Sequence, residues 1–442
     1  MHTAVVTATV SATTGATAPP DELLEFLRRC GVALCLAGEA ASRIPDEMEA
    51  IAQAYGVTES EFLVVPTGVF VRFHDEIDDV IIVDFMNADG PPFRLDQVDA
   101  LYKLINSIKR NPVPPDEAID RLKAIVASKP RFWWPLRVIG YTVLTVGLGM
   151  LLVNDQKALL ALAGLGFVVG ILRLIADKVQ VLSLALPVAA AMLVTGLAYR
   201  YGPQLGAEPS TLLIPPLVSF LPGAALTLGA QEMATRSMIS GASRIVSGVY
   251  MLLLLTFGIV AGRAIANTEP HHVDPMILPA WVPVASVPVA WVPIAGILIF
   301  GIGMFFNSSA PKWALPWLLL MLYGAWGAQQ LGGMVAGDSS GLFGAFTGGL
   351  VVVPIATLVQ RLHGPPAQVA SLPAFWLLVP GALGLAGVSN LVEGQSTTNT
   401  LVNAFLSVVS VALGILVGSS IAATARASSR LLTSRVIRKR QR

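Results

Sequence analysis

The sequence predicts an α-helical membrane protein with ten transmembrane helices, arranged as two inverted five-helix repeats, and with a cytoplasmic α/β domain at its N-terminus. Composition gives the first reason: 54% of the 442 residues are hydrophobic and 13% are charged, which is too apolar for a soluble chain of this length. The distribution of charge gives the second. Only 17 Asp, Glu, Lys and Arg residues lie between Val138 and Thr424, whereas the remaining 155 residues hold 40. A soluble segment therefore precedes a membrane domain.

A duplicated set of motifs gives the third reason. Three glycine-containing segments occur twice in the same order, each time within long apolar stretches. These pairs are residues 147–150 and 301–304, residues 221–229 and 379–387, and residues 258–262 and 414–418. Matched landmarks in the same order indicate a duplicated membrane unit, which is more typical of transporters than of enzymes.

Hydrophobic periodicity predicts the secondary structure of the soluble part. Residues 1–20 contain no Lys or Arg and no unbroken apolar run, so we expect a disordered tail and no secretory signal. Residues 21–128 are predicted to form the cytoplasmic α/β domain, and residues 129–137, with aromatics between cations, an interfacial linker. The expected helices of the domain are 21–37, 44–55, 95–108 and 115–127, and the expected strands are 62–73 and 80–85.

Ten stretches are apolar enough to span a membrane, which needs about 20 residues each. They are residues 136–153, 158–176, 179–199, 211–230, 245–266, 287–306, 314–331, 341–360, 373–392 and 402–424. We group them into a first five-helix repeat (138–266), an external loop (267–286), a second five-helix repeat (287–424) and a basic cytoplasmic tail (425–442).

Positive charges predict the orientation of these spans. With the first domain inside, the internal loops carry six cations and the external loops three, and the basic tail also falls inside. Both termini are therefore expected in the cytoplasm. Because each repeat has an odd number of spans, the second repeat enters the membrane upside down relative to the first, which is the geometry that permits alternating access.

The N-terminal motifs resemble a known family. The runs Leu36-Ala-Gly-Glu-Ala-Ala-Ser-Arg-Ile-Pro-Asp-Glu-Met-Glu49, Ala54-Tyr-Gly56 and Val65-Pro-Thr-Gly-Val69 are similar to the cytoplasmic domain of the bacterial threonine/serine exporters, and the membrane segments follow the layout of that family. The resemblance extends from Leu23 to Thr424. It implies a multi-pass protein of the bacterial inner membrane that exports threonine and serine by using the proton motive force.

Two Pro-Gly segments are the leading candidates for the substrate site. Proline and glycine can interrupt a membrane helix and leave backbone groups free to meet a ligand, although a kink that permits close helix packing is the alternative. Half-helix N-termini suit the carboxylate of a zwitterionic amino acid, and carbonyl or acidic groups suit its ammonium. The predicted substrate-binding residues are Pro222, Gly223, Gly229, Gln231, Thr235, Pro380, Gly381, Gly387, Asn390 and Gln395.

Two carboxylates close to these segments are candidates for proton coupling. Glu232 follows the first Pro-Gly segment and Glu393 follows the second, and a carboxylate near a span is costly unless it lines a cavity or reaches the interface. A solvated loop carboxylate is the alternative, and it is favoured for Glu393 because its span is expected to end at Val392.

Other polar clusters carry weaker signals. His271, His272 and Asp274, and separately the acidic turn after His74, lack a fixed metal-ligand spacing. Cys30 and Cys35 are interpreted as reduced core residues. The segment Gly337-Asp338-Ser339 resembles a serine-protease motif only superficially, because no β-barrel is expected around it to position a catalytic base. We therefore predict no catalytic residue, no metal and no cofactor.

The predicted partners are threonine, serine, protons and the lipid bilayer. A net charge of +1 gives no reason to expect nucleic acid, and the sequence leaves a homo-oligomer open. Two rival functions remain: a membrane-anchored enzyme with hydrolytic chemistry in the N-terminal domain, and a passive channel for small solutes. The N-terminal domain is expected to gate or regulate transport without turning over a substrate.

Overall fold

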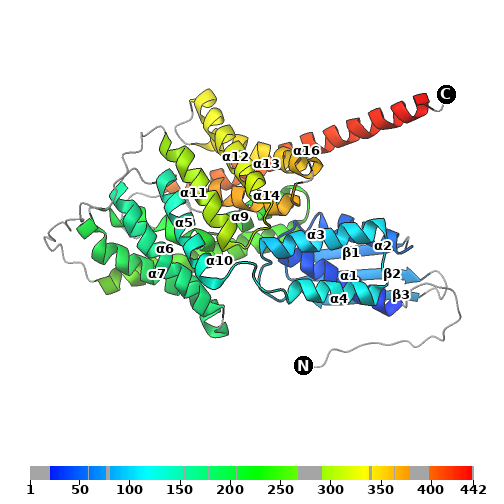
Figure 1. Cartoon of the computed structure of the whole chain (residues 1–442), viewed down its shortest axis with the longest axis horizontal. Coiled ribbons are helices and arrows are strands. Elements are labelled where there is room, and N and C mark those ends of the chain that lie inside the picture. Colours follow the sequence, from blue (N-terminus) through cyan, green and yellow to red (C-terminus); the bar gives the residue numbers. More distant parts are fainter. Residues whose placement is uncertain are drawn as a thin grey trace.

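The protein is a mostly helical membrane protein with a small N-terminal α/β region that contains a three-stranded sheet (Figure 1). The structure is a computed structural model. It describes residues 20–57, 59–75, 80–152, 156–177, 179–205, 207–266, 291–337, 341–362, 364–378 and 398–440. Residues 1–19 of the predicted tail and the whole of the predicted external loop (267–286) lie outside these ranges, whereas Pro20 already belongs to the first helix.

The N-terminal region follows the predicted order, with one correction in its sheet. Its elements are α1 (Pro20–Leu36), α2 (Ile44–Ala54), β1 (Ser60–Val65), β2 (Gly68–Asp75), β3 (Val80–Asn87), α3 (Leu95–Arg110) and α4 (Pro115–Val126). The single strand predicted over residues 62–73 is wrong, because it is a hairpin in which Val65 pairs with Gly68 across a two-residue turn. Pro66 cannot donate to a strand ladder, so it ends β1 and opens the turn.

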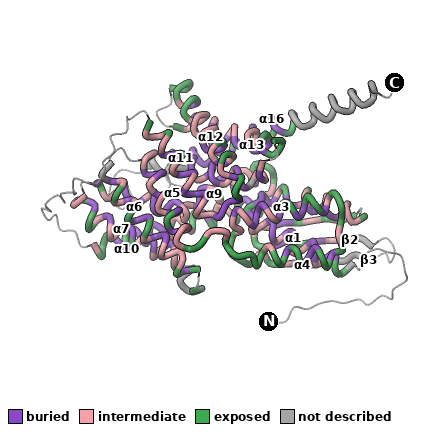
Figure 2. The backbone as a smooth tube through the Cα atoms, in the orientation of Figure 1, coloured by how far each residue is buried: buried purple, intermediate pink, exposed green. Residues whose placement is uncertain are grey.

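One face of the sheet packs on helices. Val69 and Val71 of β2 are fully buried, together with Phe26 and Leu27 of α1. Side chains alternate along a strand, so the neighbouring residue Phe70 points to the opposite face and is exposed. Figure 2 shows the buried positions continuing along α1.

The helical body contains the membrane segments. Its helices are α5 (Trp134–Leu152), α6 (Gln156–Ala176), α7 (Gln180–Tyr201), α8 (Ile214–Leu217), α9 (Gly223–Ala234), α10 (Met238–Ala266), α11 (Val292–Asn307), α12 (Leu315–Ala336), α13 (Leu342–Arg361), α14 (Ala367–Leu378) and α16 (Thr398–Arg440). Within the described residues, five helices are long and apolar enough to cross a membrane, or six if one bent pair forms a single span. Ten spans therefore remain a prediction.

Glycines set the closest helix contacts. A Cβ atom added at Gly147 of α5 would lie 2.7 Å from the Cα atom of Phe300 in α11, and one added at Gly303 would lie 2.6 Å from the Cα atom of Leu144. Both distances are far below an ordinary contact, so only glycine lets these backbones meet. Gly147 of the first motif and Gly303 of its copy therefore both lie in the α5–α11 interface, where Gly147 meets Phe300 and Gly303 meets Leu144.

The pair of glycine motifs at residues 258–262 and 414–418 also occupies matching interfaces. In α10, a Cβ atom at Gly258 would lie 2.6 Å from the carbonyl oxygen of Val188 in α7. In α16, a Cβ atom at Gly414 would lie 2.8 Å from the backbone nitrogen of Leu350 in α13. The Gly-x-x-x-Gly segments at residues 258–262 and 414–418 thus pack against α7 in the first half of the body and against α13 in the second.

The N-terminal region attaches to the helical body in two chemically different ways. Its core continues without a break into buried side chains at the ends of α11, α12 and α14, namely Phe305, Ala310, Ala314, Leu318 and Val369. Arg131 strengthens this side by donating to the carbonyl oxygen of Ala310 at 2.9 Å. On the side of α9 and α10, polar contacts join the two parts, including a hydrogen bond of 3.2 Å from the Ser240 hydroxyl to the carbonyl oxygen of Val64.

Candidate functional site

A broken helix lies at the first Pro-Gly segment. The segment Pro209–Phe220 and helix α9 meet at an angle of 60°. Leu221, the residue before Pro222, is extended, and Pro222 forms the N-cap of α9. Steric clash with the proline ring disfavours a helical conformation at Leu221, which explains why the helix stops there and restarts at Gly223. The second segment, with Pro380, Gly381, Gly387, Asn390, Glu393 and Gln395, lies outside the described residues.

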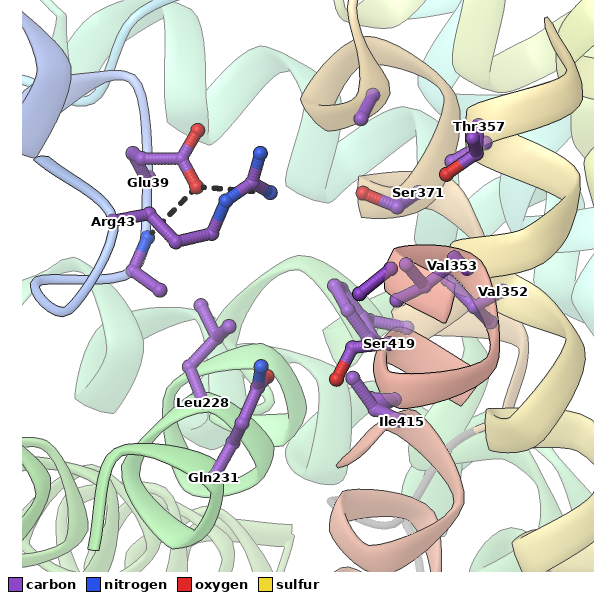
Figure 3. A pocket seen from close by; sticks show the side chains of 17 residues that line it. Glu39, Arg43, Leu228, Gln231, Val352, Val353, Thr357, Ser371, Ile415 and Ser419 are labelled. Atoms are coloured by element: carbon purple, nitrogen blue, oxygen red, sulfur yellow. Dashed lines mark hydrogen bonds and ion pairs between the residues drawn. The ribbon is translucent and has the colours of Figure 1, made fainter. Parts of the chain in front are cut away.

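A cavity of about 320 Å³ opens beside this broken helix (Figure 3). It is bounded by the turn formed by residues 38–43, by α9, and by α13, α14 and α16. Most of its wall is apolar, with a few polar side chains among Val352, Val353, Ala356 and Phe375. The polar members are Glu39, Arg43, Gln231, Thr357, Ser371 and Ser419. A small, largely apolar pocket with a few convergent polar groups is typical of small-molecule sites.

The charged side of the cavity comes from the 38–43 turn. Arg43 Nη1 lies 3.5 Å from Glu39 Oε1, and the backbone N–H of Ala40 donates to the same oxygen at 3.2 Å. The Tyr102 hydroxyl donates to the other carboxylate oxygen. Burial, followed by the neighbouring Glu39 charge, raises the pKa of Tyr102 well above its usual range, so this phenol stays a donor. Glu39 also raises the pKa of Arg43, which keeps the guanidinium charged.

Glu232 lies next to the cavity within a polar cluster that joins three elements. Its side chain is fully buried, and Arg244 Nε in α10 donates to both carboxylate oxygens, at 3.1 and 3.0 Å. The backbone N–H of Ala41 donates to Glu232 Oε1 at 2.8 Å, and Arg244 Nη2 donates to the carbonyl oxygen of Glu39 at 3.2 Å. We call Glu232 and Arg244, with the backbone of Glu39 and Ala41, the polar latch.

The predicted substrate residues that the structure describes fall into different places. Gln231 lines the cavity, whereas the hydroxyl of Thr235 donates back to the carbonyl oxygens of Gln231 and Glu232 at the end of α9. Gly229 faces α10, since an added Cβ atom would lie 2.9 Å from the carbonyl oxygen of Gly241. Pro222 and Gly223 form the break itself and are not among the residues that line the cavity.

Several cavity residues were missed by the sequence analysis. Glu39 and Arg43 sit in the run that carries the family resemblance, but they belong to a soluble domain and were not linked to the membrane site. Ser419 directly follows the second Gly-x-x-x-Gly motif, which places it on the helix face next to the packed one. Ser371 and Thr357 carry no local signal, because single hydroxyl residues are common within membrane helices.

The remaining predicted clusters add no second site in the described part of the chain. Cys30 is buried and Cys35 partly buried, both as free thiols, and burial raises their pKa values to about 12 and about 11. Among the described residues, no group of three or more His, Cys, Asp and Glu side chains is placed to hold a metal ion. The histidines and aspartate near residue 272 and the centre of the acidic turn after His74 lie outside those residues.

Fold and cavity together define a multi-pass membrane protein with a cavity beside a broken helix. Residues 25–266 match the family described as "Putative threonine/serine exporter", and the chain belongs to that family. It is also similar to the pheromone-regulated membrane protein 10 of three fungi. Identity is 24% over 404 residues for Candida albicans (strain SC5314), 24% over 399 for Saccharomyces cerevisiae (strain YJM789) and 23% over 400 for Eremothecium gossypii.

These alignments cover 86% of this chain but only 34%, 48% and 50% of the respective fungal proteins. The chain thus spans at most half of the length of these relatives. No solved structure matches the chain.

Proposed function

We propose that this protein exports threonine and serine by alternating access, driven by the proton motive force. The observation that carries the proposal, beyond family membership, is the cavity where the broken helix meets α13, α14, α16 and the 38–43 turn. Its size suits a small solute, and its hydroxyl and amide groups suit a substrate that carries a hydroxyl and a zwitterionic backbone.

The helix packing supports a duplicated, two-state arrangement. In the proposed scheme, α5–α10 form the first repeat and α11–α16 form the second. The first helices of the two repeats, α5 and α11, contact each other through glycines. The α7–α10 and α13–α16 pairs use the same Gly-x-x-x-Gly contact. In inverted repeats, two halves with equivalent packing can exchange roles, which gives inward-open and outward-open states.

The polar latch suggests how a proton could drive the change of state. Protonation of Glu232 would remove the charge that holds Arg244, weakening a buried ion pair that connects α9 and α10 to the 38–43 turn. Breaking a buried pair by removing one charge is strongly destabilising for the contact it holds. Protonation would therefore release the turn from the first repeat.

The N-terminal region acts as a gate in this scheme. Its apolar core is shared with the ends of α11, α12 and α14, so we expect it to move together with the second repeat. Its contacts with α9 and α10 include the polar latch, which is the part that a single proton can weaken. We place the region and both termini in the cytoplasm, as the distribution of cations predicts.

Flux measurements test the proposal. The full chain is reconstituted into proteoliposomes loaded with labelled threonine, and efflux is followed with a proton gradient, without one, and with a protonophore. We expect a gradient to drive threonine against its own concentration gradient and the protonophore to stop this. Equal efflux in all three conditions would favour a passive channel, and an absence of threonine flux would contradict the proposal altogether.

A further inference from the structure

The two charged side chains that line the cavity both come from the N-terminal α/β region. They are Glu39 and Arg43, and the other lining residues in the described part of the chain are neutral. The Glu39 side chain is 3% exposed, whereas that of Arg43 is 47% exposed. Figure 3 shows the guanidinium of Arg43 beside the Glu39 carboxylate, on the side of the cavity opposite Ser371. The buried acid is therefore the fixed member of the pair, and the arginine is the member open to a ligand.

We propose that Arg43 binds the α-carboxylate of the transported amino acid, so that the N-terminal α/β region supplies part of the substrate site. The inference rests on the proposed function and adds the orientation of the substrate. A guanidinium has five N–H donors in a planar fork that matches a carboxylate with two parallel hydrogen bonds. One contact with Glu39, at 3.5 Å, leaves donors of this fork for a second carboxylate.

Glu39 acts as a positioning residue for Arg43. The backbone N–H of Ala40 and the hydroxyl of Tyr102 hold its carboxylate in place. A held carboxylate restricts the rotamers of a long, flexible arginine before substrate arrives. Pre-ordering of this kind reduces the entropy lost on binding.

The wall of the cavity opposite Arg43 would recognise the side chain of the substrate by hydrogen bonding. Hydroxyl groups reach it from three helices: Thr357 from α13, Ser371 from α14 and Ser419 from α16 (Figure 3). With the carboxylate on Arg43, the rest of a threonine or serine molecule points to this wall. A site that hydrogen-bonds a substrate hydroxyl discriminates strongly against an analogue that lacks it, because its own polar groups then lose their partner.

Competition binding on the full-length protein tests the orientation. Labelled threonine is bound to the parent chain and displaced with threonine, with threonine amide, which has no carboxylate, and with valine, which has a methyl group in place of the hydroxyl. We expect the amide to compete at least about tenfold less well than threonine, because a hydrogen bond to a charged group is worth about ten- to a hundredfold. Valine should also compete at least about tenfold less well, because the polar groups of the opposite wall lose the substrate hydroxyl as their partner. If threonine amide displaces the label as well as threonine does, the inference is overturned by the parent chain, without any variant.

The same binding assay on variants of Arg43 provides a second test. Arg43→Gln should weaken threonine binding by about ten- to a hundredfold and should abolish the preference for threonine over its amide. Arg43→Lys keeps the charge but not the fork, so it should be intermediate. Arg72→Gln is the matched control, since Arg72 is similarly exposed (43%) and pairs with Glu61 on the sheet.

The outcomes separate this inference from the function on which it rests. If the parent chain neither binds nor transports threonine, the proposed function fails. If it transports threonine while Arg43→Gln keeps both the affinity and the preference over the amide, only the assignment of Arg43 is overturned. Equal losses in Arg43→Gln and Arg72→Gln would likewise contradict a specific role.

Discussion

Replacing Gly303 by alanine should destabilise the protein, although alanine is the better helix former. In α11, the added Cβ atom would lie 2.6 Å from the Cα atom of Leu144 and 2.7 Å from the carbonyl oxygen of Gly140, whereas ordinary contacts begin near 3.4 Å. Both neighbours are backbone atoms, so no side chain can rotate away and the two helices must separate by most of an ångström. Overpacking of this kind typically costs about 1–3 kcal/mol.

Gly327→Ala is the matched control for this prediction. Gly327 lies in α12, also within an apolar helix, but no atom of the described residues lies within 4 Å of an added Cβ atom there. Replacing glycine by alanine in a helix interior gains about 1 kcal/mol of helix propensity. Both variants gain the helix propensity of alanine, so that gain cancels between them, and Gly303→Ala should be less stable than Gly327→Ala by about 1–3 kcal/mol.

Thermal unfolding of the purified protein in detergent measures the difference. Apparent melting temperatures of the parent, Gly303→Ala and Gly327→Ala are compared at one heating rate, because membrane proteins often unfold irreversibly. We expect Gly303→Ala to melt below the parent and Gly327→Ala to melt at or above it. If Gly303→Ala is as stable as Gly327→Ala, the close contact between α5 and α11 is wrong, and the support it gives to a paired arrangement of the repeats is lost.

Two further predictions concern coupling and topology. Glu232→Gln removes the charge that holds Arg244, so it should abolish proton-driven accumulation and spare exchange of threonine for threonine; accumulation at the parent level would exclude Glu232 as the proton carrier. In sealed cells, an impermeant maleimide should label a cysteine placed at the exposed Glu208 but not one at Ser128, and labelling of Ser128 would reverse the orientation. As a control in permeabilised cells, where the reagent reaches both sides, Cys30 and Cys35 should stay unlabelled at pH 8, because a thiol with a raised pKa holds almost no thiolate there.

Local signals in the sequence predicted most of the helices. The apolar periodicity located α1–α4 to within a few residues, and the long apolar stretches each overlap a helix of the body. The error in the sheet arose at Pro66, where a run of β-formers on both sides hid a two-residue turn. Because only one residue in that run forbids strand hydrogen bonds, composition alone did not separate the two strands.

The cavity was harder to predict, because its residues are distant in the chain. Gln231 could be proposed, since it follows a Pro-Gly segment that interrupts its own helix. Arg43 lies almost 190 residues earlier and reaches the cavity only because the N-terminal region docks on the ends of α9 and α14. Such a contact depends on tertiary packing, and no periodicity or spacing in one sequence encodes it.

The 38–43 turn touches both proposed sites, and this has a consequence for coupling. Its side chain Arg43 faces the cavity, while its backbone is held by Glu232 through the N–H of Ala41 and by Arg244 through the carbonyl oxygen of Glu39. A substrate carboxylate on Arg43 shares the guanidinium with Glu39, and a proton on Glu232 weakens the hold on the adjacent peptide groups. Substrate binding and protonation therefore both act on contacts of the 38–43 turn. Substrate and proton can influence each other here through direct contacts within one short turn, so that coupling needs no signal carried across the membrane helices.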